Sequence, residues 1–163
     1  MHASGSGRYD IHEVLRQYAA EKLGEIPGEE DKVHDRLSEY YTEFLHQRKR
    51  DMKGSKQKEA LKQIGEEIEN VCLAWRWAVK HGRDVEVAKS VESLYFYYDT
   101  RGWFREGEEA LRQAVEKMDG TPEEPGREQS SELGEHAEAR QLLEECLEVV
   151  EEVLALDSRI KDL

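Results

Sequence analysis

The chain has 163 residues, a formal net charge of -13, and equal shares of charged and hydrophobic residues at 37% each. A chain of this length suits a single domain, and its abundant Ala, Glu, Leu, Lys and Arg all favour helices. The acidic charge disfavours binding to nucleic acid and to anionic membranes, and no apolar run is long enough to span a bilayer. We therefore expect an all-α, cytoplasmic protein without β-sheet and without nucleic-acid or membrane partners.

The N-terminal part is expected to hold a polar leader and one helix. Residues 1–8 are polar and rich in Gly and Ser, so we interpret them as a cloning remnant or as disordered. An amphipathic helix is predicted over Tyr9–Leu23. Asp10 and Glu13 have the spacing of a capping box at its start.

A long helix is predicted over Glu29–Met52, because apolar residues recur there at spacings of three and four. Its end carries a basic run over His46–Lys58. Such a run either contacts an acidic partner or is a solvated helix end, and the second interpretation is the more common. A third helix is expected from about Ser55 to Gly82.

The stretch Asp84–Met118 predicts two amphipathic helices around a turn at Gly102, which is an αα-hairpin. We expect Leu94 and Leu111 to pack across this hairpin. The order of apolar and small residues resembles one tetratricopeptide repeat (TPR). The residues that carry this resemblance are Val91, Leu94, Tyr95, Tyr98, Gly102, Phe104, Gly107, Leu111 and Ala114.

This stretch departs from the repeat at three positions. Val91 and Tyr95 stand where the first helix of the repeat usually has Trp and Gly, and Gly107 stands where the second usually has Ala. The second helix is therefore the closer match. The resemblance of this stretch to one TPR implies a helical binding scaffold without identifying a ligand, and we expect residues 28–118 to form a TPR-like sensor domain.

Three pieces of the chain carry a second resemblance, and their residues are, in order, Ile11, His12, Glu13, Leu15, Arg16, Tyr18 and Ala19; then Glu67, Ile68, Glu69, Asn70, Val71, Ala74 and Trp77; then Gly102, Trp103, Phe104, Arg105, Glu106 and Gly107. In this order they resemble the STAND-class signalling regulators of bacteria, the AP-ATPase or NB-ARC group. Residues 9–27 resemble the end of the winged-helix region, where Met-His-Asp precedes a Leu-Arg-x-Tyr-Ala helix. The resemblance implies that His12 matches the histidine that senses bound ADP.

The last part of the chain is expected to be a loop and a helix. Residues 119–131 contain Pro and Gly without an apolar period, which predicts a loop. Residues 132–163 resemble the second helix of a TPR and carry two apolar stripes. One stripe can pack on the preceding hairpin, and the other alternates at four and three as a heptad seam. The seam residues are Leu142, Cys146, Val149, Val153, Leu156, Ile160 and Leu163.

We find no pattern of catalytic or metal-binding residues. The chain lacks the G-x-x-x-x-G-K-[ST] phosphate loop, so His12 is expected to be inactive in nucleotide sensing here. Its acidic pairs lie opposite the apolar stripes, as on a solvated face, and its histidines lack zinc-site spacing. Cys72 and Cys146 indicate buried thiols in a reducing compartment. We expect no enzyme activity, no cofactor and no metal.

An aromatic and basic cluster is the one candidate binding site. Its side chains could line a groove for a peptide or a small effector, although ordinary core packing is the more common role of such aromatic residues. The candidate groove residues are Trp75, Arg76, Tyr97, Arg101, Trp103 and Arg105.

These patterns lead to one main hypothesis and two alternatives. The resemblance to STAND-class regulators implies that the chain is a non-catalytic sensor and protein-interaction module that controls a nucleotide switch outside it. The first alternative is a structural oligomerisation module that acts through the heptad seam, and a homodimer through residues after Leu133 is expected with its orientation open. The second is a DNA-binding regulator, against which the net charge argues.

Overall fold

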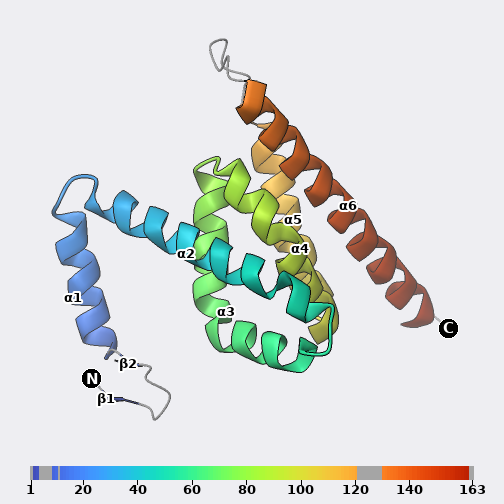
Figure 1. Cartoon of the computed structure of the whole chain (residues 1–163), viewed down its shortest axis with the longest axis horizontal. Coiled ribbons are helices and arrows are strands. Elements are labelled where there is room, and N and C mark those ends of the chain that lie inside the picture. Colours follow the sequence, from blue (N-terminus) through green and yellow to red (C-terminus); the bar gives the residue numbers. More distant parts are fainter. Residues whose placement is uncertain (1, 4–8, 11, 121–129, 162–163) are drawn as a thin grey trace. The chain divides into compact units, whose positions relative to one another are not determined.

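The computed structural model describes residues 2–3, 9–10, 12–120 and 130–161. Within these residues six helices follow two very short strands (Figure 1). The elements are β1 (His2–Ala3), β2 (Tyr9–Asp10), α1 (Glu13–Gly24), α2 (Glu29–Met52), α3 (Gln57–Lys80), α4 (Asp84–Arg101), α5 (Phe104–Asp119) and α6 (Ser130–Lys161). The predicted all-α fold is confirmed. The predictions for residues 1, 4–8 and 121–129 lie outside the described part.

The start of the chain departs from the predictions in two ways. β1 and β2 form a two-residue antiparallel pair, so the expectation of no sheet is wrong for Tyr9 and Asp10. The expected capping box is also wrong, because α1 begins at Glu13 and its N-cap is His12. The Nδ1 atom of His12 accepts a hydrogen bond from the backbone N–H of Val14 at 3.3 Å, which satisfies one free donor of the first turn.

The chain divides into two compact units, residues 1–36 and 37–163. The first holds β1, β2, α1 and the beginning of α2, and the second holds the rest of α2 and α3 to α6. The core of the second unit is built by all five of these helices. Its largest fully buried apolar side chains are Leu45, Met52, Ile64, Val71, Val91, Leu94, Tyr97, Leu111 and Leu143.

Helices α4 and α5 form the predicted hairpin. Gly102 ends α4 with φ 69°, a left-handed conformation that a residue with a Cβ rarely adopts. The backbone N–H of Trp103 donates to the carbonyl of Tyr98 at 2.9 Å and closes the last turn. Leu94 and Leu111 are both 1% exposed, as expected of core positions on the two helices.

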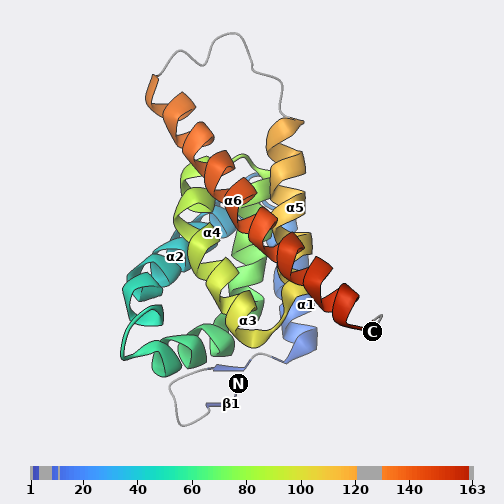
Figure 2. The ribbon, with the colours of Figure 1, turned by 90° about the vertical axis from the view of Figure 1, so that its right-hand side faces the viewer.

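Helix α6 lies against both helices of this hairpin (Figures 1 and 2). It runs parallel to α4, because His136 contacts Asp84 near the start of both helices. It runs antiparallel to α5, because Arg140 pairs with Asp119 and Arg112 pairs with Glu151. α6 therefore takes the direction that the first helix of a following hairpin would have.

One of the two predicted stripes of α6 is buried in this contact. Leu143 is 0% exposed and Val150 is 3% exposed, and Leu147 and Leu154 pack against the core. Ala139, also 0% exposed, is the small residue at the start of this stripe. The resemblance of the segment to a second TPR helix stays a prediction, since this direction alone does not decide it.

Candidate functional site

Three of the six predicted groove residues lie together at the end of the α4–α5 hairpin. The Tyr97 and Trp103 rings meet edge to face with their centroids 5.9 Å apart. The Arg101 guanidinium lies over the Tyr97 ring, 5.4 Å from its centroid. Tyr97 is 2% exposed, whereas Trp103 is 43% exposed, so the buried ring supports an exposed indole and an exposed cation.

Gly65 of α3 makes room for this group. A Cβ at that position would lie 3.1 Å from both the Arg101 guanidinium and the Tyr97 hydroxyl. Such a distance is shorter than ordinary van der Waals contact between these atoms, so a larger residue would push the Arg101 side chain away. No pattern in the sequence singles out Gly65, because its position relative to α4 appears only in the fold.

The other three groove residues lie elsewhere or offer less surface. Trp75 is 5% exposed, and its Nε1–H donates to the carbonyl of Ala110 at 3.4 Å, so its ring fills the core between α3 and α5. Arg76 and Arg105 are exposed. Arg76 is close enough to the Tyr98 phenol to influence its ionisation, which places Arg76 beside α4. The groove as a whole stays a prediction.

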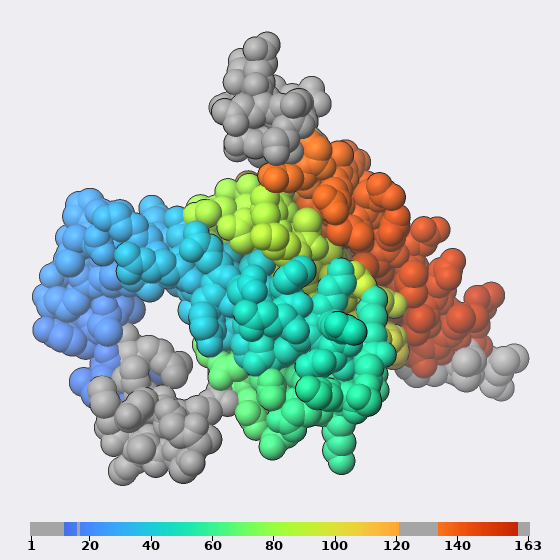
Figure 3. Space-filling view, viewed as in Figure 1, coloured from blue at the N-terminus to red at the C-terminus, as the bar shows by residue number. Residues whose placement is uncertain are grey.

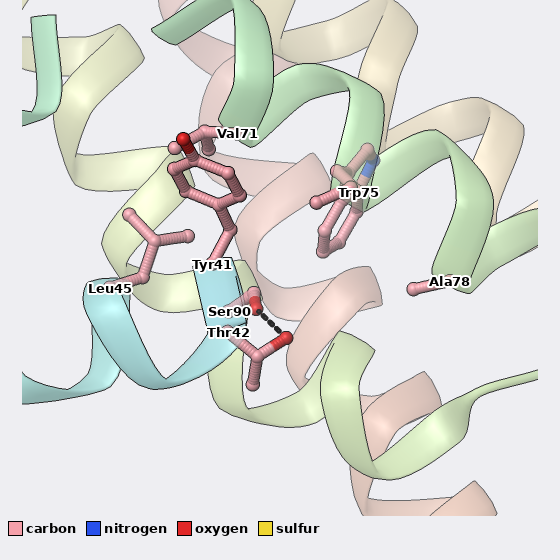
Figure 4. A pocket seen from close by; sticks show the side chains of 8 residues that line it. Tyr41, Thr42, Leu45, Val71, Trp75, Ala78 and Ser90 are labelled. Carbon is pink, nitrogen blue, oxygen red and sulfur yellow. Dashed lines mark hydrogen bonds between the residues drawn. The ribbon is translucent and has the colours of Figure 1, made fainter. Parts of the chain in front are cut away.

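The small cavity beside Trp75 does not fit an effector. It lies among Tyr41, Leu45, Val71, Trp75 and neighbouring small residues, and Figure 4 shows these side chains around it. The Ser90 hydroxyl donates to the Thr42 hydroxyl at 3.3 Å on its wall. Its volume of about 10 Å³ is roughly what one water molecule needs. We therefore assign this cavity to core packing.

Glu67 and Asn70, part of the motif after the winged-helix segment, have a structural role here. The Tyr41 hydroxyl donates to the Glu67 carboxylate at 2.8 Å, and the Asn70 side-chain amide donates to the same oxygen at 2.9 Å. Burial and this carboxylate raise the pKa of Tyr41 to about 12. The group joins α2 to α3, and sequence spacing within α3 could not have shown its partner on α2.

Part of the basic run is used inside the fold. Lys49 of α2 and Lys53, the residue that follows this helix, both pair with Glu92 of α4. Burial opposes the charge of Glu92, but the two ammonium groups still lower the pKa of its carboxyl group. Arg48 stacks on Phe44, 3.6 Å from the ring centroid, and donates to the Gln63 side chain at 2.9 Å. The solvated-end interpretation is therefore incomplete, because these three cations stabilise contacts of α2.

The predicted seam of α6 has a mixed environment. Val149 is 44% exposed and Leu156 is 51% exposed, whereas Leu142 and Val153 are half-buried. The Ile160 side chain lies outside the described residues. Cys146, half-buried in the same helix, has its thiol pKa raised by burial to about 11. The exposed positions give α6 an apolar strip without a partner among the described residues.

The described residues show neither a metal-binding group nor a membrane helix. No three or more His, Cys, Asp or Glu side chains in this part of the chain gather as metal ligands would. None of its helices combines the length and the apolar character needed to cross a bilayer. Cys72 and Cys146 are free thiols.

Comparison with known proteins gives one kind of relative. The chain is 33% identical over 103 residues to provisionally named HTH-type transcriptional regulators from Mycobacterium bovis and from two strains of Mycobacterium tuberculosis. The match covers 63% of this chain but only 11% of each relative, so the chain spans about a ninth of their length. No family model matches the chain, and no solved structure matches it.

Proposed function

We propose that this chain is a non-catalytic, TPR-like sensor and protein-interaction module of a STAND-type transcriptional regulator in the cytoplasm. The similarity to HTH-type regulators supports a regulatory setting. The ordered motifs around His12, Asn70 and Gly102 support the STAND assignment. The absence of a phosphate loop from the sequence supports a module that acts on a nucleotide switch located elsewhere.

The direction of α6 is the observation that carries the proposal. Contacts of α6 with Asp84, Asp119 and Arg112 place it parallel to α4 and antiparallel to α5. Helical-repeat scaffolds grow by adding helices in this alternating way, and they present the resulting surface to proteins or small effectors. The arrangement therefore supports a binding scaffold over an isolated hairpin.

The end of the α4–α5 hairpin supplies the surface for an effector. Trp103 offers an exposed indole, and Arg101 offers a cation held against Tyr97. An aromatic face beside a fixed cation suits a ligand with an anionic group and a flat or apolar part. An effector bound better by one arrangement of the helices would shift the switch toward that state.

A ligand screen by thermal shift on the full-length regulator tests this proposal. A compound that binds the folded state raises the melting temperature. We expect Arg101→Ala and Trp103→Ala to abolish that shift, and Arg36→Ala, at an exposed position on α2, to leave it unchanged. A shift that survives both hairpin variants would place the effector site elsewhere.

The second candidate function is an oligomerisation module. The exposed Val149 and Leu156 support it, since apolar side chains on one strip of a helix favour association by burial. We propose a homodimer through residues after Leu133. Light scattering tests it with Leu156→Glu, which alters an exposed position and leaves the core intact. A dimer that persists in this variant would contradict the proposal that the seam forms the dimer interface.

A further inference from the structure

A stretch with excess positive charge lies where α2 meets α3. Residues 46–63 contain seven Lys and Arg against two Asp and Glu, in a chain whose net charge is -13. The end of α2 and the start of α3 lie side by side in the space-filling view (teal and green in Figure 3). A cationic surface on an acidic molecule attracts acidic groups and repels basic ones at short range.

Six of these seven cations, all except the exposed Arg50, fall into two groups. Arg48, Lys49 and Lys53 are engaged within the fold, as described above. Lys56 and Lys58 make no ion pair with any other described residue, and the Lys62 ammonium lies 4.0 Å from Glu66. Together with Arg101 of α4, these lysines line an open depression of about 770 Å³, whose lining also includes Glu59 and the buried Leu61. We call Lys56, Lys58, Lys62 and Arg101 the basic depression.

Helix α6 carries the complementary surface. Glu145, Glu148 and Glu152 are exposed at spacings of three and four, so they share one face with Val149 and Leu156. We call these five residues the acidic face of α6. Two other carboxylates of the helix are already paired inside the chain, Glu144 with Arg140 and Glu151 with Arg112. Glu145 accepts a hydrogen bond from the neutral Gln141 side chain at 2.9 Å and keeps its charge without a cationic partner. The acidic face therefore combines exposed negative charge with exposed apolar area.

Both surfaces lie toward the same end of the second unit. Arg101 is at the C-terminal end of α4, and α6 runs parallel to α4 with Cys146 near Glu92 and Tyr95. The acidic face therefore follows α4 to the end where Arg101 lies. Two copies related by a two-fold axis could each place this face on the other's basic depression, which closes a dimer through two identical contacts.

We propose that the basic depression binds the acidic face of α6 from a second copy of this chain. The inference rests on the homodimer proposed above, to which residues after Leu133 contribute one surface, and it assigns the opposing surface to the basic depression. The net charge of -13 does not prevent it, because at physiological salt the screening length is about 8 Å and the facing charges dominate. Lys and Glu would pair at the rim, while Val149 and Leu156 would meet the apolar stems of the lysine side chains.

Sedimentation velocity of the full chain tests this proposal. We expect a dimer at about 50 mM salt that dissociates at about 500 mM, because salt screens exposed ion pairs. The variant Lys56→Gln/Lys58→Gln/Lys62→Gln should weaken dimerisation by roughly tenfold or more, since three exposed pairs each contribute a small factor. The matched variant Lys32→Gln/Lys80→Gln/Lys89→Gln has the same charge change and should leave the dimer intact.

A charge exchange gives the second arm of the test. Lys58→Glu alone and Glu152→Lys alone should each weaken the dimer, and the double variant should recover part of the loss. A monomer at every salt concentration would overturn the proposal, as would equal effects of the two triple variants. A dimer that resists salt and is lost only in Leu156→Glu would overturn the charged contact and keep the seam. Association with a DNA duplex in place of a second copy would also overturn it.

Discussion

At the scale of single residues, two glycines set the distances between helices. A Cβ at Gly107 of α5 would lie 3.2 Å from the Tyr98 Cβ and 3.5 Å from two of its ring atoms, so α4 and α5 approach closely there. A Cβ at Gly65 of α3 would press on Tyr97 and Arg101 in the same way. The TPR resemblance identified Gly107 as unusual, but nothing in the sequence identified Gly65.

Enlarging Gly107 should destabilise the hairpin. We expect Gly107→Leu to lower the free energy of unfolding by about 1–3 kcal/mol, because the Tyr98 Cβ is fixed to the backbone and cannot move aside. Gly134→Leu is the matched control, since a Cβ there meets no atom within 4 Å. Urea denaturation of both variants measures the difference. Equal midpoints would show that the hairpin is not closely packed at this position.

Shortening a buried leucine should be costly as well. Leu94 is 1% exposed, and we expect Leu94→Ala to lower the free energy of unfolding by about 2–5 kcal/mol, through lost burial and the cavity left behind. Leu73, 38% exposed on α3, provides a control that should lose much less on the same change. Chemical denaturation is the measurement. A Leu94→Ala cost no greater than the control cost would place Leu94 outside the core.

At the scale of elements, polar side chains fix α2 against its neighbours. Tyr41 donates to Glu67 of α3, the backbone carbonyl of Leu45 accepts from Ser93 of α4 at 3.4 Å, and Lys49 pairs with Glu92 of α4. The apolar period predicted that α2 is a helix with the bounds observed. It could not predict these partners, because they lie about 26 to 48 residues away along the chain.

Because Tyr41 is buried and bonded to Glu67, the free energy of unfolding should fall as the pH rises into the alkaline range. The Tyr41 pKa rises from 10.0 to about 12 on folding, so between these values the unfolded chain binds fewer protons than the folded one. The protonated Tyr41 hydroxyl therefore contributes its full share to the free energy of unfolding below pH 10, and this share is lost as the pH rises through about 12. We expect Tyr41→Phe to reduce this loss of stability, measured by urea midpoints across the range. Tyr40→Phe, at a position 63% exposed, should not reduce it.

The stability of the fold should depend on the size of the side chains that α6 buries against α4 and α5. Ala139 is 0% exposed, and a larger side chain there would force the helices apart. We predict that Ala139→Leu lowers the free energy of unfolding by about 1–3 kcal/mol. Ala137→Leu changes an exposed position two residues away and should be nearly neutral. Thermal unfolding that shows no difference between the two variants would contradict the packing of α6 described above.

At the scale of the whole molecule, the sequence predicted individual helices better than it predicted which elements and side chains come together. Apolar periods predicted the helices over Glu29–Met52 and Asp84–Met118 closely, because each period depends on near neighbours. The sequence did not predict the cap at His12, because Asp10 and Glu13 have the spacing of a capping box and therefore favoured Asp10. It also did not predict the β1–β2 pair. Of the candidate site, Tyr97, Arg101 and Trp103 come together around one turn, whereas Trp75 belongs to the core.

Hydrogen exchange with mass spectrometry measures whether α6 stacks on the α4–α5 hairpin as part of one scaffold. We expect the backbone amides of α6 around Ala139, Leu143 and Val150 to exchange as slowly as those of α4 and α5, because the three helices bury each other and unfold together. Exchange of these α6 amides at the rate of an isolated helix, while α4 and α5 stay protected, would contradict the scaffold.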